Sequence, residues 1–276
     1  MCRLLGILST KPTNGRKYLF DDQCSLYAQS YANPKKLQRD GWGLGYYVNG
    51  SPKMIKSEKP IYMERRRFIS AINSISSKII IAHIRRASNP RGLPRERLIS
   101  IENSQPFTYD RYLFAHNGVI RIPDEVLSRL GRWRSMVEGL NDSEVYFWYI
   151  IKRMIDYGDS FKEALIDFQR TLWDLWSSCR ENYPSIDRPY QGLNAIFSDG
   201  KHLYAYAKYD EKRITSTSIC FKDQPSLQMS YILKSNSLVV ASEKTNREEE
   251  WKPLKSGQLL VAWFSDETIN LEIKRI

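Results

Sequence analysis

The chain has 276 residues and a formal net charge of +11, and 42% of its residues are hydrophobic and 12% aromatic. This composition is typical of a folded globular protein with a sizeable core, and it excludes a disordered or fibrous chain. No apolar run approaches the roughly 20 residues of a membrane span, and the first apolar stretch is too short and too early for a signal peptide. We therefore expect a cytoplasmic protein whose residues 2–276 form a single domain.

The first half of the chain is expected to form short strands. Its apolar segments are rich in β-branched and aromatic residues and are separated by loops rich in Gly, Pro and Asn. The predicted strands are 2–8, 43–48, 78–84 and 112–120. Residues 25–34 favour a helix that ends before Pro34, and 88–97, with its Pro and Gly residues, is predicted to be a loop.

The middle of the chain changes to a helical period. In 141–158, Asn141 followed by Glu144 is a helix-capping signature, and Gly158 is a stop signal. In 161–176 the apolar residues recur on one helical face. The last third predicts a hairpin over 193–209 with Asp199-Gly200 at its turn, then strands over 237–243, 258–264 and 269–275. Strands on both sides of two long helices predict an α+β layered fold with largely antiparallel sheets.

The cysteines and histidines favour no metal or cofactor. The cysteines are few and widely spaced, at Cys2, Cys24, Cys179 and Cys220, with no C-x-x-C pair. They predict neither a zinc site nor a disulfide framework, and a cytosolic location would keep them reduced. Three scattered histidines do not suggest a metal site, and "RDGWGLGYY" (39–47) lacks the third Gly of a dinucleotide-binding loop.

The positive charge is concentrated in three runs, 64–68, 83–97 and 131–135. Such runs fit nucleic acid, an acidic partner or an anionic substrate. A solvated surface is the interpretation that we favour, because no helix-turn-helix, zinc-finger or RNP-like pattern accompanies the charge. We therefore do not expect a nucleic-acid partner. A non-enzymatic interaction protein, with salt-sensitive binding and indifference to Cys2→Ala, is the weakest alternative.

Cys2 has two interpretations. It is either a small apolar residue that opens a buried strand or an N-terminal nucleophile. If Met1 is removed, the thiol and a free α-amine belong to the same residue. The reference pKa of a thiol is about 8.5 and that of an α-amine roughly 7.7–8.0, so the amine can accept the thiol proton near neutral pH.

Other candidate residues also leave two interpretations open. Asn117-Gly118 is a common tight-turn pair, but its amide and N–H groups can also stabilise an oxyanion. Arg85 and Arg86 follow a predicted strand, and one of them can bind a carboxylate in bidentate fashion. Asp142 either complements the dipole of the first long helix or receives a substrate ammonium.

In order along the chain, these segments resemble the class II glutamine amidotransferases, which belong to the N-terminal nucleophile hydrolases. The matching stretches after Cys2 are "DGWGLGYY", "AHIRRAS", "ENSQPF", "FAHNGVI", "NDSEV" and "VVASEK". The resemblance implies a four-layer αββα sandwich. It also implies that Cys2 is the nucleophile with its own α-amine as base, and that Asn117 and Gly118 form the oxyanion hole. Arg85 would bind the α-carboxylate of glutamine, and Asp142 its α-ammonium.

The resemblance further implies that Ser88, Gly41 and Trp42 contribute to substrate binding, with the 41–42 backbone passing close to the pocket. The chain departs from hexosamine-forming relatives at Arg86, where they have Trp, and at Gln105-Pro106-Phe107, where they have His-Pro-His. It is more similar to the compact stand-alone subfamily, which includes hydrolases of γ-glutamyl compounds.

The resemblance predicts an amidase that hydrolyses the side-chain amide of glutamine through a Cys2 thioester and releases glutamate and ammonia. Because about 32 residues follow "VVASEK", we expect any ammonia-accepting synthase to be a separate subunit. The alternative is a γ-glutamyl hydrolase that acts on a larger amide or peptide, whose anionic leaving part would bind Arg86 and the loop 89–97. An oligomer is compatible with either interpretation.

Overall fold

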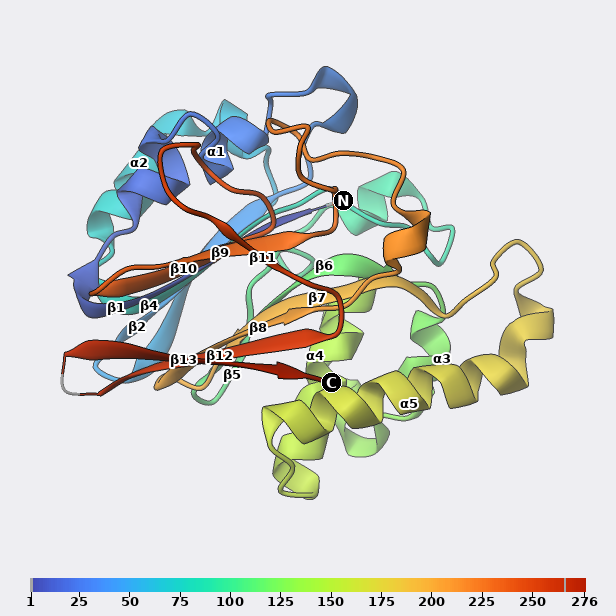
Figure 1. Ribbon diagram of the computed structural model, residues 1–276. Helices are drawn as coiled ribbons and strands as arrows, with labels where there is room; N and C mark the ends of the chain where they lie inside the picture. Colours follow the sequence, from blue (N-terminus) through green and yellow to red (C-terminus); the bar gives the residue numbers. More distant parts are fainter. Residues whose placement is uncertain (1, 266) are drawn as a thin grey trace.

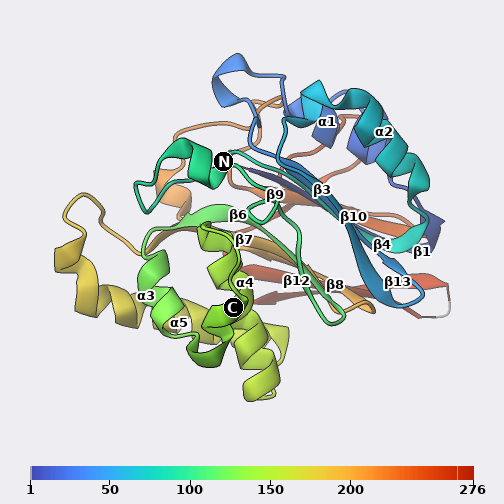
Figure 2. The ribbon, with the colours of Figure 1, turned by 180° about the vertical axis from the view of Figure 1, so that it is seen from behind.

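The computed structural model describes residues 2–265 and 267–276. Two antiparallel sheets pack face to face, and helices cover both outer faces (Figures 1 and 2). In spatial order, the first sheet consists of β11 (Lys252–Leu254), β9 (Met229–Leu233), β10 (Ser237–Ala241), β1 (Arg3–Thr13), β4 (Ser77–Ile84), β2 (Trp42–Val48) and β3 (Ser51–Ser57). The second consists of β13 (Thr268–Arg275), β12 (Gln258–Ser265), β8 (His202–Ala207), β7 (Tyr190–Ser198), β6 (Tyr112–Ile120) and β5 (Phe107–Tyr109).

Within the described residues, five α-helices complete the αββα sandwich that the family resemblance implies. The first sheet is covered by α1 (Leu26–Gln29) and α2 (Arg65–Ser74), and the second by α3 (Pro123–Ser128), α4 (Asp142–Asp156) and α5 (Phe161–Cys179) (Figure 1). Among the described residues, no helix combines the length and the apolar character needed to span a membrane.

The core consists of three apolar layers, one between each pair of neighbouring structural layers. β1 shows why the opening segment of the sequence is apolar without alternation. Leu5 and Ile7 pack toward the helices over the first sheet, whereas Leu4 and Leu8 pack into the interface between the sheets. β1 lies in the middle of its sheet and is buried on both faces. Neither face meets water, and the strand therefore has no polar side.

The predicted long helices are confirmed. Asn141 caps α4 by accepting the backbone N–H of Glu144 at 2.7 Å. A capping box of Ser160 and Glu163 begins α5. The predicted helix over 25–34 is much shorter, because α1 ends at Gln29 and Pro34 begins a separate 3-10 turn.

Sequence analysis did not identify α2, which begins in the basic run 64–68. Three side chains of this helix are buried, those of Phe68, Ala71 and Ile72. The three arginines at positions 65–67 are exposed. This run is therefore a solvated helix surface, as the favoured interpretation of the charge expects.

The expectation that no disulfide forms is wrong. Cys24, just before α1, is bonded to Cys220, which is 196 residues away in the sequence. Local cysteine spacing carries no information about such a distant pair. Cys2 and Cys179 are free thiols.

Candidate active site

Cys2 lies immediately before β1, at the end of the central strand of the first sheet. Its partly buried Sγ lies 3.4 Å from both the backbone N and the backbone O of Arg86. Burial raises the pKa of the Cys2 thiol, and the Arg86 N–H and the charge of Arg85 oppose that shift only in part. The resting thiol is therefore protonated and needs a base before it can act as a nucleophile.

Arg85 follows β4 and is a buried cation, 3% exposed. Its guanidinium donates from Nη1 to the backbone oxygens of Asp40 at 3.3 Å and Leu98 at 2.6 Å. Throughout the described ranges, Arg85 forms no ion pair with a carboxylate. A buried cation without a counter-ion favours the binding of an anion.

Asp142 is the first residue of α4 and is almost fully buried. Its Oδ1 accepts the Ser88 hydroxyl at 2.9 Å, and its Oδ2 accepts the backbone N–H of Ile120 at 2.7 Å. These contacts tie the start of α4 to the end of β6 and to the segment after Arg86. The carboxylate is thereby fixed in orientation, and it is close enough to Cys2 and Arg85 to act on both electrostatically.

Asn117 and Gly118 lie inside β6 rather than at a turn. The Asn117 Nδ2 donates to the Ser242 Oγ at 3.2 Å, and the same oxygen accepts the Leu4 N–H at 2.9 Å. The buried Asn117 Oδ1 has no hydrogen-bond partner in the described part of the chain. A side chain at Gly118 would place its Cβ 1.8 Å from the Gly192 oxygen, so only glycine allows β6 and β7 to approach this closely.

Gly41 is also required by the local geometry. It has a φ of +118°, its oxygen accepts the Arg85 N–H at 2.8 Å, and a Cβ there would lie 2.6 Å from the Ser104 Oγ. The Trp42 side chain is fully buried, and its indole N–H donates to Glu64 at 2.9 Å beside Phe68 of α2. Any contact of Trp42 with a substrate therefore has to come from its backbone.

The sequence patterns did not indicate the roles of two buried acids near the site, Glu243 and Asp40. The Arg3 guanidinium donates to the Cys2 carbonyl oxygen at 3.1 Å and lies 3.6 Å from the fully buried Glu243 carboxylate. Glu243 accepts three further backbone N–H groups at 2.6–2.9 Å, those of Ile219, Cys220 and Phe221. Asp40 similarly binds the Ala87 N–H at 2.8 Å and pairs with Arg95. Both acids belong to the motifs "DGWGLGYY" and "VVASEK", but only the folded chain shows what they contact.

The Cys24–Cys220 disulfide lies beside Glu243, with the Cys24 sulfur 3.8 Å from Oε1. Two cysteines and a carboxylate are a plausible metal-ligand set by residue type. Glu243 already accepts three N–H groups and pairs with Arg3, so its oxygens are engaged. We therefore assign no metal to this cluster.

The arginines of the basic segment 83–97 differ in what they contact. Arg91 pairs with Asp124 and donates to the Leu140 oxygen, and Arg95 pairs with Asp40, so both hold the loop in place. The exposed Arg86 side chain forms no ion pair within the described part of the chain. Nearby, Lys36 donates to the Thr217 oxygen at 2.8 Å, and burial together with the charges of Arg3 and Arg86 lowers its pKa.

Two buried histidines lie next to this site, and they face different layers: His83 follows Ile79 and Ile81 on the face of β4 that meets the second sheet, whereas His116 packs against Tyr146 of α4. His116 contacts the Ser143 hydroxyl at 2.9 Å and the Gly192 oxygen at 3.1 Å. Neither ring nitrogen of His83 has a hydrogen-bond partner among the residues that the structure describes. Burial lowers the pKa of both, for His83 well below its usual range, where the Arg85 charge adds to the effect. Both histidines are therefore neutral in the folded protein.

We predict that stability falls as pH drops below about 6.5, the ordinary pKa of histidine, because the unfolded chain then takes up protons that the folded chain does not. Each histidine contributes a slope of up to about 1.4 kcal/mol per pH unit, which continues down to its lowered pKa. Urea unfolding between pH 8 and 5 measures this slope. His83→Leu should make it shallower without loss of stability at pH 8, and an unchanged slope would contradict the prediction.

Comparisons with known proteins place the chain in a family. A family model described as glutamine amidotransferases class-II matches residues 1–272. An uncharacterized protein of Methanocaldococcus jannaschii is 28% identical over 283 residues, covering 95% of this chain and 69% of the relative. The gamma-glutamyl-hercynylcysteine sulfoxide hydrolase of Mycobacterium tuberculosis is 32% identical over 124 residues, which are 44% of this chain and half of that protein.

Two solved structures have a similar fold. A glutamine aminotransferase class-II domain protein from Silicibacter pomeroyi superposes with a TM-score of 0.62 at 18% identity, over 98% of both chains. The glutamine phosphoribosylpyrophosphate amidotransferase from B. subtilis gives a TM-score of 0.64 at 15% identity, over 98% of this chain and 49% of that one. At these identities the likeness concerns the fold alone.

Proposed function

Because the chain belongs to the class II glutamine amidotransferases, we propose that it hydrolyses the side-chain amide of glutamine through a Cys2 thioester and supplies the ammonia to a separate partner enzyme. The observation that carries this proposal is the electrostatic arrangement around Cys2. Arg85, a buried cation with no carboxylate partner among the described residues, directly precedes the residue whose backbone contacts the sulfur, and the buried carboxylate Asp142 accepts the hydroxyl of Ser88, two residues further on.

These two groups match the charges of a free amino acid. The α-carboxylate of glutamine would neutralise Arg85, whose Nε and Nη2 donate to no acceptor among the described residues. The α-ammonium would bind Asp142, whose orientation is fixed by Ser88 and Ile120. With both ends of the amino acid held, the side-chain amide extends toward Cys2.

The reaction then needs a base and an oxyanion hole. After removal of Met1, the Cys2 α-amine accepts the thiol proton, and the thiolate attacks the amide carbon. Asn117 Nδ2 and the Gly118 N–H stabilise the oxyanion of the tetrahedral intermediate. The protonated amine then gives its proton to the departing ammonia, which leaves a γ-glutamyl thioester. Water, deprotonated by the same amine, attacks the thioester and releases glutamate and the free thiol.

A γ-glutamyl hydrolase with a larger substrate is the second candidate function. Arg86 supports it, because its backbone N and O both contact the Cys2 sulfur. Its side chain is exposed and pairs with no described carboxylate. Lys36 adds a second cation nearby. An anionic leaving group would neutralise both. The relative from Mycobacterium tuberculosis, named as a hydrolase of a γ-glutamyl compound, is consistent with this candidate.

A substrate panel separates the two functions. We expect glutamine to be hydrolysed with a higher kcat/KM than γ-glutamyl dipeptides, as measured by glutamate release. A dipeptide with a free carboxylate that exceeds glutamine, and that loses its advantage when its carboxylate is amidated or in Arg86→Ala, would establish the second candidate instead. Lys53→Ala, at an exposed lysine of β3, is the charge-matched control.

A further inference from the structure

A cavity of about 570 Å³ lies at one end of the second sheet, beside α5. The end of β8, the start of β12 and the end of β13 lie side by side at this cavity. Ala207 of β8 pairs with Gln258 of β12, and Gln258 pairs with Arg275 of β13. Residues 208–212, which follow β8, form another part of the wall. None of the candidate active-site residues lines this cavity.

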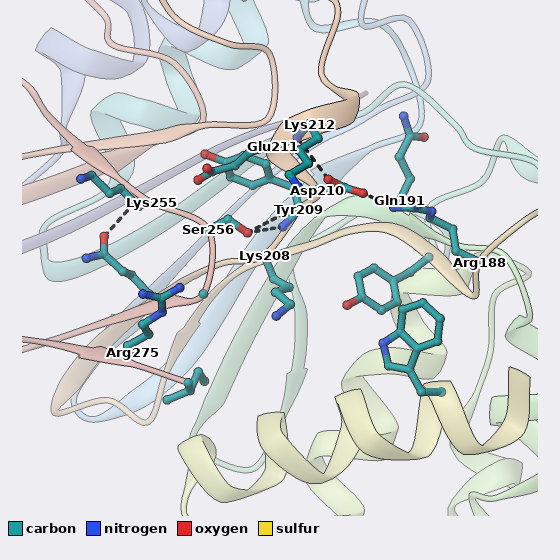
Figure 3. A pocket seen from close by; sticks show the side chains of 15 residues that line it. Arg188, Gln191, Lys208, Tyr209, Asp210, Glu211, Lys212, Lys255, Ser256 and Arg275 are labelled. Atoms are coloured by element: carbon teal, nitrogen blue, oxygen red, sulfur yellow. Dashed lines mark hydrogen bonds and ion pairs between the residues drawn. The ribbon is translucent and has the colours of Figure 1, made fainter. Parts of the chain in front are cut away.

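The lining has an excess of positive charge. Its basic residues are Arg188, Lys208, Lys212, Lys255 and Arg275, and its acidic residues are Asp210 and Glu211. Asp210 is already engaged, because it lies 2.5 Å from Arg188. In the part of the chain that the structure describes, Lys208, Lys255 and Arg275 form no ion pair. Figure 3 shows Lys208 in the middle of the lining, with Lys255 and Arg275 on one side and Arg188 on the other.

The backbone of Lys208 is held in place at the wall of the cavity. Its backbone N–H donates to Asn194 Oδ1 at 2.8 Å, and its oxygen accepts the Leu193 N–H, also at 2.8 Å. The side chain is half-buried, and burial together with the charge of Arg275 lowers its pKa. Neighbouring cations that repel one another, and that pair with no carboxylate among the described residues, are stabilised by a bound anion.

The cavity also has an aromatic wall. Trp173 of α5 and Tyr190 of β7 both line it, with their ring centroids 6.1 Å apart in a T-shaped arrangement. The volume is that of a small-molecule site. We propose that this cavity is a second ligand site, separate from the candidate active site, which binds a small polyanion of the phosphate class through Lys208, Lys255 and Arg275.

Inorganic pyrophosphate is the probe that tests this site. Calorimetric titration at constant ionic strength should show saturable binding to one site. Lys208→Met and Arg275→Gln should each weaken it by about tenfold or more, because each removes one of the cations that contact the anion. Lys53→Met removes the same charge from the exposed face of β3 and should leave the binding unchanged.

Thermal unfolding without the anion serves as the folding control. Lys208→Met should not lower Tm, because it relieves repulsion with Arg275, whereas added pyrophosphate should raise the Tm of the wild type more than that of the variant. Equal binding by wild type and both cavity variants, or equal losses in Lys53→Met, would overturn the proposal. So would binding of a short single-stranded RNA without binding of pyrophosphate. None of these measurements depends on amidase activity.

Discussion

Replacing Cys2 with alanine is expected to reduce glutamine hydrolysis by a factor on the order of 10⁴ or more, as loss of a covalent nucleophile does in other hydrolases. The fold should survive, because the Cys2 sulfur contacts only the backbone of Arg86 among the described residues. Glutamate release measures the rate. Since Arg85 and Asp142 remain in Cys2→Ala, glutamine should still bind, which calorimetry can verify.

The α-amine of Cys2 can be tested independently of the thiol. Intact-mass measurement of the purified protein should show that Met1 is absent. An uncleaved N-terminal extension leaves the thiol in place but converts the amine to an amide, so activity should be lost to a similar extent as in Cys2→Ala. A fully active extended protein would show that another group accepts the thiol proton. A protein that retains Met1 and is active would contradict the proposed mechanism in the same way.

The sequence predicts the main strands and the long helices well because each has a strong local pattern, whereas the number of layers follows only from the family resemblance. The apolar run that becomes β1 and the capped segment that becomes α4 can be identified without knowledge of their neighbours. α1 and α2 depend more on the sheet they cover. α2 begins with three arginines and has few apolar residues, so its sequence shows only a weak helical pattern. A helix this short is marginal by itself and depends on its packing on the first sheet.

Local sequence patterns could not predict contacts between segments that are far apart in the chain. The bond between Cys24 and Cys220 and the contacts of Glu243 with Arg3 both join segments more than 190 residues apart. The residue types in the candidate site were predictable from motifs. Only the fold shows that Arg85 pairs with no carboxylate in the described ranges and that the Trp42 side chain faces α2.

Asn117→Ala is expected to lower kcat by about 10²–10³-fold with little change in KM, because it removes one donor to the oxyanion but no group that binds the charged ends of glutamine. In the resting protein the Asn117 side chain forms a single hydrogen bond to the described residues, from Nδ2 to the Ser242 hydroxyl. Its other N–H is therefore available to a substrate oxygen. Steady-state kinetics of glutamate release measure kcat and KM separately.

Ser242→Ala is the matched control for this prediction. It removes the oxygen that accepts the N–H groups of both Asn117 and Leu4, so it loosens the same region while the Asn117 amide remains. We expect its kcat to stay within about tenfold of the wild-type value, since the two neutral hydrogen bonds that are lost contribute only about 1 kcal/mol each to stability and the amide that donates to the oxyanion remains. If both variants lose activity equally, Asn117 acts by supporting the end of β1 and not by stabilising the oxyanion. If Asn117→Ala raises only KM, the amide binds the ground state, and the oxyanion donors must be sought elsewhere on β6.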